Sequence, residues 1–123
     1  DSFSDLPLTS DEQSLVDKCA GDLMLFRLRG PMSFGAAKGI SERMMLIRNY
    51  KVLILDITEV PRLGVTATLA IEEMVEEAKA NSRKAYVAGA SGKVKERLAR
   101  FGIDGIIETR KEALKAALNA INS

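Results

Sequence analysis

The apolar run Val52–Leu55 (VLIL), which ends at Asp56, constrains the fold of this chain more than any other segment. Four consecutive apolar residues are typical of a central strand that is covered on both faces. Further apolar runs at residues 23–29, 84–89 and 106–107 alternate with segments whose apolar residues recur every three or four positions. This alternation predicts an α/β fold, with a mixed, mostly parallel sheet and helices packed on it.

Length and composition favour one folded domain. The 123 residues are 46% hydrophobic and 28% charged, as in an ordinary globular protein. Residues 1–22 have no steady period and are predicted to be an N-terminal linker, which leaves residues 23–123 as the domain. Pro61 cannot donate to a strand ladder, so residues 57–63 are predicted to be a loop or edge excursion. Helices are expected at about 34–48, 64–80, 91–101 and 111–121.

Charge and residue usage exclude several classes of function. Eighteen basic and seventeen acidic side chains leave a net charge of +1, which provides no field to hold a nucleic acid. The chain has no histidine and a single cysteine, Cys19, so imidazole catalysis and the common zinc sites are excluded. Asp56 and Glu59 could form a magnesium-binding pair, but no third carboxylate stands at a spacing typical of a metal site. We therefore expect no catalysis, no metal and no cofactor.

Candidate functional residues follow the central strand, because ligands of open α/β sheets bind beyond the carboxyl ends of strands, at helix N-termini. This set could hold an anion or a nucleotide, or contact a partner protein. The structural alternative is that the glycine permits a turn, the hydroxyl residues cap helices, and the aspartate ends the strand. The turn at 89–92 lacks both phosphate-binding fingerprints. The candidates are Asp56, Gly64, Val65, Thr66, Thr68 and Ser91.

Two sequence motifs resemble those of the STAS domains, which are named for sulfate transporters and anti-sigma-factor antagonists. Residues 28–37 (LRGPMSFGAA) resemble the phrase G-P-L-F-F-x-x-A, which is typical of the transporter branch, the SulP family. Residues 52–67 are similar to the stretch that ends in Asp-Ser-Ser/Thr-Gly before a helix. In this chain that tetrapeptide is Gly64-Val65-Thr66-Ala67, so only Thr66 keeps a hydroxyl, at the phosphoacceptor position. The degenerate motif argues against a phosphorylation switch.

The resemblance implies a STAS regulatory and dimerisation domain at the cytoplasmic face of the plasma membrane, as the C-terminal part of a transporter of bicarbonate or sulfate. The implied partners are the transmembrane domain of the same transporter, a second copy and a regulatory protein. The alternative functions are a free phospho-switch protein that docks to a kinase, and a nucleotide-binding regulatory module. The candidates for contact with the second copy or the membrane domain are Pro31, Met32, Phe34 and Met45.

Overall fold

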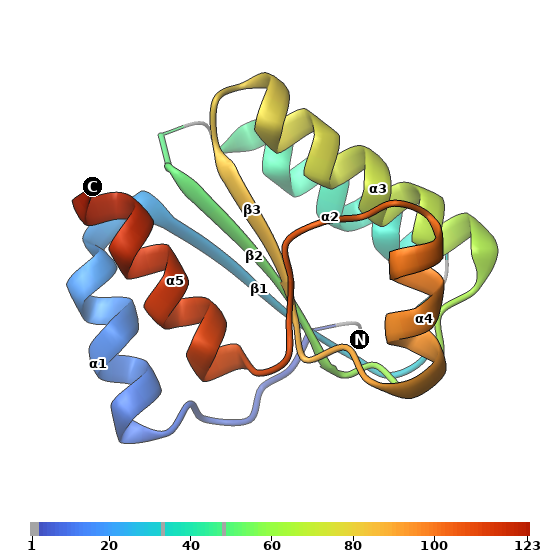
Figure 1. Ribbon diagram of the computed structural model, residues 1–123, viewed down its shortest axis with the longest axis horizontal. Coiled ribbons are helices and arrows are strands. Elements are labelled where there is room, and N and C mark those ends of the chain that lie inside the picture. The colour runs from blue at the N-terminus through green and yellow to red at the C-terminus, as the bar shows by residue number, and fades with distance from the viewer. Residues whose placement is uncertain (1–2, 33, 48) are drawn as a thin grey trace.

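A four-stranded sheet in the order β1-β2-β3-β4 forms the centre of the molecule, and all its strands are parallel (Figure 1). The computed structural model describes residues 3–32, 34–47 and 49–123. An isolated antiparallel bridge joins Phe3 to Leu28 at the β1 edge. The predicted α/β fold with a mostly parallel sheet is confirmed. The strands are β1 Leu23–Arg29, β2 Val52–Glu59, β3 Lys84–Ala88 and β4 Ile106–Ile107.

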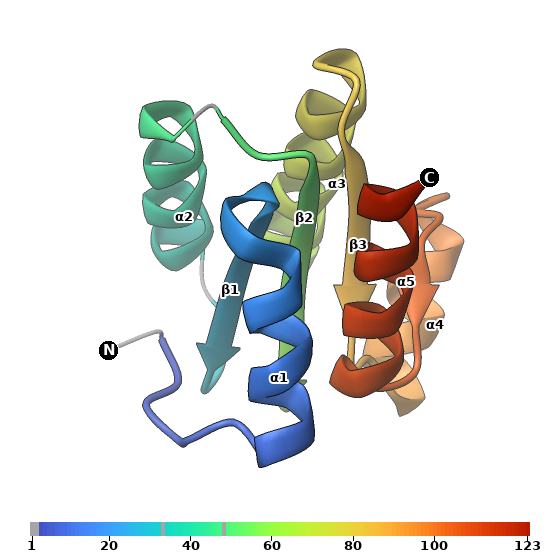
Figure 2. The same ribbon diagram turned by 90° about the vertical axis from the view of Figure 1, so that its left-hand side faces the viewer.

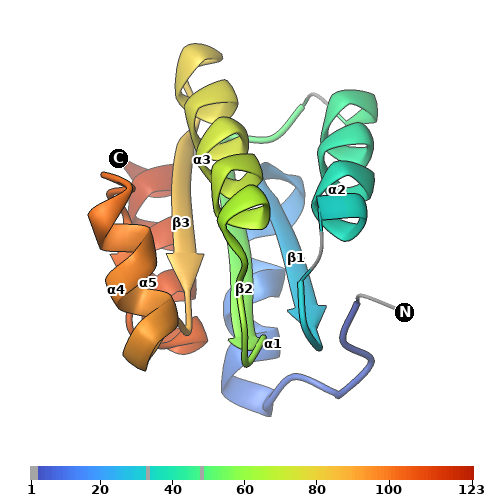
Figure 3. The same ribbon diagram turned by 90° about the vertical axis from the view of Figure 1, so that its right-hand side faces the viewer.

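Helices form one layer on each face of the sheet (Figures 2 and 3). The three crossover helices cover one face, and the first and last helices cover the other, as the opposite views show. Because the strands pair in chain order, each right-handed crossover places its helix on the same side. The crossover helices are α2 Phe34–Leu46, α3 Val65–Ala80 and α4 Gly92–Arg100, and the other layer is α1 Ser10–Cys19 and α5 Arg110–Asn122.

The central strand β2 supplies both halves of the core. Leu53, Leu55 and Ile57 pack under the crossover helices, whereas Val52 and Ile54 face the layer of α1 and α5. All five side chains are at most 1% exposed. Since side chains alternate along a strand, Asp56 continues the second set and points a carboxylate toward α1 and α5.

The N-terminal stretch differs from the predicted linker, because Ser10–Cys19 forms α1 and packs against α5. A capping box starts this helix: the Thr9 hydroxyl accepts from the Glu12 backbone N–H, and the Glu12 carboxylate accepts from the Thr9 backbone N–H. The helix buries few apolar side chains, so its period is weak in the sequence. A short 3₁₀ turn, η1 Ala20–Asp22, connects it to β1.

The segment after the apolar run also differs from the prediction. Residues 57–59 continue β2 rather than forming a loop, and the Glu59 carbonyl accepts from the backbone N–H of Gly30 at 2.9 Å. Ile57 is buried, so apolar packing extends the strand past Asp56. Pro61 comes two residues after the strand ends, where its missing N–H costs no ladder bond.

Candidate functional site

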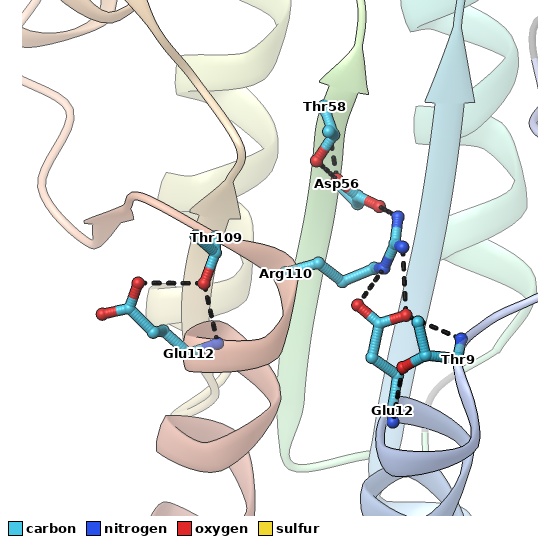
Figure 4. Close-up of polar contacts among 7 residues, drawn as sticks. All are labelled: Thr9, Glu12, Asp56, Thr58, Thr109, Arg110 and Glu112. Atoms are coloured by element: carbon cyan, nitrogen blue, oxygen red, sulfur yellow. Dashed lines mark hydrogen bonds and ion pairs between the residues drawn. The ribbon is translucent and has the colours of Figure 1, made fainter.

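Arg110, the first residue of α5, joins three elements at the carboxyl end of β2 (Figure 4). Its Nε and Nη2 donate to the two carboxylate oxygens of Glu12 on α1, at 2.9 and 3.0 Å. Its Nη1 donates to Asp56 Oδ2 at 2.9 Å. The three side chains are 17%, 8% and 2% exposed respectively, so this ion cluster is shielded from water. We call these three residues the Arg110 cluster.

Every carboxylate oxygen in the Arg110 cluster accepts at least one hydrogen bond. Asp56 Oδ1 accepts from both the backbone N–H and the hydroxyl of Thr58. Glu12 Oε1 also accepts from the backbone N–H of Thr9 in the capping box (Figure 4). A carboxylate that accepts several hydrogen bonds in its charged form is a weak base. The geometry therefore suits a structural joint between α1, β2 and α5 and does not suit general base catalysis.

The electrostatics of the cluster follow from these hydrogen bonds. Arg110 holds the pKa of Glu12 below its ordinary value, and burial opposes this effect. In return, the hydrogen bond to Glu12 raises the pKa of Arg110, so the guanidinium stays charged at any pH at which the protein is folded. The two acids thus share one permanent buried cation.

The candidate loop between β2 and α3 lies on the other face of the sheet from the Asp56 carboxylate. Gly64 occupies the N-cap position of α3 and provides no side-chain cap, and Val65 and Thr66 in the first turn are exposed. Thr68 is buried, and its hydroxyl donates to the Gly64 carbonyl at 2.8 Å. The sequence grouped Asp56 with these residues because they follow one strand, but the pleat of the strand separates them.

Ser91 occupies the predicted N-cap position of α4, but its side chain makes no capping hydrogen bond. The turn before it packs closely on Thr58 instead. Gly89 has a φ of +83°, and a Cβ there would lie 2.8 Å from the Thr58 Cα and would overlap Oγ1 of the same residue. Thr58 therefore connects the β3–α4 turn to Asp56.

The four residues predicted to contact a second copy or the membrane domain differ in how far their side chains are exposed. Pro31 and Met45 are exposed, the latter by 61%. Met32 is buried beside Leu63 in a parallel bridge, so its side chain is not on the surface, contrary to expectation. Phe34 begins α2, but its side chain lies outside the described residues.

The sequence interpretation missed Glu12, Thr58 and Arg110. One local signal was present, since Thr9 and Glu12 have the spacing of a capping box and so announce a helix. Arg110 has no such signal: it meets Glu12 across 98 residues and Asp56 across 54. Within the described ranges, none of the helices has the length and hydrophobicity that crossing a membrane requires.

Comparison with known proteins gives concordant matches. The sequence model of the STAS domain family matches residues 14–117 of this chain. The bicarbonate transporter BicA of Synechocystis sp. is 36% identical over 127 residues, and that of Picosynechococcus sp. is 38% identical over the same length. Each alignment covers 98% of this chain and 22% of the relative, so the chain spans about a fifth of the length of these relatives. The SulP transporter STAS domain from Vibrio cholerae, a solved structure, aligns with a TM-score of 0.75 and 27% identity over 90% of this chain and 97% of that one.

Proposed function

The chain belongs to the STAS domain family, and from that membership we propose that it is the regulatory and dimerisation domain of a SulP-family anion transporter. The observation that carries the proposal is the 36–38% identity to bicarbonate transporters over 98% of the chain. Because the chain corresponds to about a fifth of those proteins, the remainder is the part that would move the anion. The partner is then the transmembrane domain of the same polypeptide, and the domain lies at the cytoplasmic face of the plasma membrane.

Bicarbonate is the proposed cargo of the attached transporter, with sulfate as the alternative. Both of the curated relatives are named as bicarbonate transporters, which supports the first choice. The cargo is selected in the membrane part, and the described residues of this chain contribute no step to its chemistry. The Arg110 cluster fits a structural role in this domain, because its carboxylates already accept hydrogen bonds from Arg110 and Thr58.

Regulation by such a domain requires a surface that prefers one transport state over another. The segment that precedes α1 runs beside the carboxyl end of β1, where the backbone N–H of Ser4 donates to the Arg27 carbonyl at 2.7 Å (Figure 2). The Arg110 cluster then fixes α1 to β2 and α5. A displacement that enters through the N-terminal segment would thus reach the sheet through a rigid joint. Pro31 and Met45 remain the proposed contacts with the second copy or the membrane domain.

Anion uptake by the full transporter tests the proposal. We would compare bicarbonate uptake, and separately sulfate uptake, in cells that express the complete protein, the protein without this domain, and the protein with Arg110→Met. We expect the deletion to alter uptake and to weaken dimer formation measured by chemical cross-linking. A strictly monomeric domain, combined with uptake that ignores the deletion, would refute the regulatory function. A reading frame without hydrophobic spans upstream of Asp1 would refute the link to a transporter.

One observation favours a second function, a phospho-switch. Thr66 is exposed in the first turn of α3, where a kinase can reach it and where the helix dipole favours a phosphate. Incubation with candidate STAS-partner kinases should then add the mass of one phosphoryl group, about 80 Da, to the wild type and not to Thr66→Ala. Stoichiometric modification would favour the switch, and its absence would favour the transporter domain.

A further inference from the structure

Helix α4 carries the densest run of positive charge in this chain. Its nine residues include Lys93, Lys95, Arg97 and Arg100, against a single acid, Glu96. Residues three and four positions apart share one face of a helix, so Lys93, Arg97 and Arg100 form a stripe. Lys93 and Arg100 are exposed, and Arg97 is half-buried. We call this stripe of three cations the α4 basic face.

The apolar side of α4 fixes the direction of the basic face. Leu98 is 0% exposed, and Val94 and Phe101 pack against the same core cluster. Because these three side chains lie against the rest of the domain, the stripe of cations lies on the outer part of the helix. Figure 3 shows α4 at the β3 side of the sheet, away from α2. The α4 basic face is therefore open to a partner.

The cations of α4 have no acidic partner within the described part of the chain. Elsewhere on the surface, Lys79 pairs with Asp104 and Lys111 pairs with Asp11. No carboxylate in the described ranges, that of Glu96 included, forms a salt bridge with a lysine or arginine of α4. Like charges three or four positions apart on a helix repel each other. An anionic surface outside the domain would relieve this repulsion.

The side chains around the cations favour a lipid surface over an acidic protein. Protein interfaces depend on aromatic or apolar anchors that become buried in the contact. The large apolar side chains that this domain exposes lie on other elements, such as Leu46 on α2 at 84% and Val65 on α3 at 52%, and α4 exposes none. Anionic headgroups attract a basic helix by charge alone. The α4 basic face therefore fits a bilayer surface.

The start of α4 lies at the edge of the sheet where the N-terminal segment enters. The backbone N–H of Ser4 donates to the Arg27 carbonyl near the carboxyl end of β1, and Lys93 follows the carboxyl end of β3. Because the strands are parallel, these two ends share one edge of the sheet. In the proposed transporter the membrane part precedes the N-terminal segment, so this edge is the one nearest to the bilayer.

We propose that the α4 basic face binds the anionic phospholipid headgroups of the cytoplasmic leaflet. The place of the bilayer rests on the proposed function, whereas the binding itself can be tested on the chain alone. Each cation close to an anionic bilayer raises the affinity about fivefold, so three cations raise it about a hundredfold. This weak binding is sufficient for a tethered domain, because attachment to the membrane part keeps the lipid at a high effective concentration. Lipid composition then helps to set the orientation of the domain.

Co-sedimentation with lipid vesicles tests the proposal. The chain is mixed at pH 7 with vesicles of phosphatidylcholine alone, or with vesicles in which about 30% of the lipid is phosphatidylglycerol. We expect binding to the anionic vesicles at about 50 mM salt, with a Kd on the order of 5 mM lipid, and little binding at about 500 mM salt. The neutral vesicles should not bind the chain. Equal binding to both kinds of vesicle would overturn the proposal.

Variants of the α4 basic face test which residues bind. The triple variant Lys93→Gln, Arg97→Gln, Arg100→Gln should weaken binding to the anionic vesicles at least about tenfold. The triple variant Lys93→Arg, Arg97→Lys, Arg100→Lys keeps the charge and should bind within about twofold of the wild type. Urea unfolding of each variant confirms that the fold is intact. Loss of binding in the charge-preserving variant would contradict an electrostatic contact.

A matched variant separates this face from the net charge of the chain. Lys18, Lys38 and Lys115 are exposed on α1, α2 and α5. Replacing all three with glutamine changes the net charge as much as the glutamine variant of α4 does, yet binding should stay within about twofold. Equal losses in the two glutamine variants would rule out a specific face.

Two further outcomes count against the inference. Binding of the chain to poly-L-glutamate but not to anionic vesicles would assign the α4 basic face to an acidic protein instead. Absence of binding to anionic vesicles at low salt would overturn the lipid contact, and the transporter proposal would still stand or fall by the uptake experiment. Vesicle binding by a chain whose reading frame has no membrane spans would keep the lipid contact and remove the transporter.

Discussion

Replacing Arg110 with methionine should lower the free energy of unfolding by about 3 to 5 kcal/mol, the usual cost of removing one partner from a buried ion pair. This large loss of stability follows from burial. Glu12 and Asp56 are only 8% and 2% exposed, and the substitution would leave both carboxylates buried without a cation. Methionine fills a similar volume, so lost packing contributes little. The measurement is urea unfolding at pH 7, with an unchanged m value as evidence that the folded state is intact.

A neighbouring pair provides the control. Lys111 and Asp11 join the same two helices at 3.2 Å, but their side chains are 46% and 74% exposed. Lys111→Met should therefore change the free energy of unfolding by less than about 1 kcal/mol. The triple variant Glu12→Gln, Asp56→Asn, Arg110→Met leaves no buried charge and should recover about half of the loss. Equal effects of the Arg110 and Lys111 substitutions would refute the reasoning, because burial would then not matter.

The loss caused by Arg110→Met should also depend on pH. The folded state lowers the pKa of Glu12 from 4.5, so this group stabilises the wild type above pH 4.5 and the contribution is lost as the pH falls through the lowered value. In the variant, burial without the cation raises the pKa of Glu12, so the variant regains stability as the pH falls through this raised value. The difference between the two proteins should therefore narrow between pH 7 and pH 4. A constant difference across this range would contradict the electrostatic origin of the loss.

The remaining predictions concern single positions, each checked by urea unfolding. Thr9→Ala removes the capping box of α1 and should cost about 1 kcal/mol, whereas a cost near zero would show that α5 alone holds the helix. Gly89→Ala forces a Cβ into Thr58 at a left-handed position and should cost at least about 2 kcal/mol. A neutral result there would mean that the turn relaxes freely. Thr66→Ala should change stability by less than about 0.5 kcal/mol, because the side chain is exposed, and a larger loss would reveal a structural role.

Most of the architecture could be predicted from local pattern. The run Val52–Leu55 predicted a strand covered on both faces, and Leu53 and Ile54 do enter opposite halves of the core. The periodic segments gave α2, α3, α4 and α5 to within a few residues. The helix α1 was missed because the three apolar side chains Leu15, Val16 and Cys19 make a weak stripe, although the capping box at its start was readable.

Which residues come together in the candidate sites, by contrast, depended on how the helix layers pack on the sheet. Asp56 and Thr66 are ten residues apart and were expected to act together. The pleat of β2 turns the Asp56 side chain toward α1 and α5, whereas Thr66 lies on α3, which covers the other face of the sheet. Arg110 reaches Glu12 and Asp56 because α1 and α5 share one layer, and no local signal encodes that neighbourhood. A groove of about 230 Å³ between α2 and α3 likewise forms only after two helices and the starts of two strands have come together.

Sequence alone therefore determined the family, the strands apart from the end of β2, and every α-helix of the described residues except α1. Each of these is written in short-range periodicity or in contiguous motifs. Only the tertiary structure decided which charges are buried together and where a cavity opens. The physical reason is range: hydrophobic periodicity is local along the chain, whereas a buried ion pair or a groove joins residues that become neighbours only after the layers have packed.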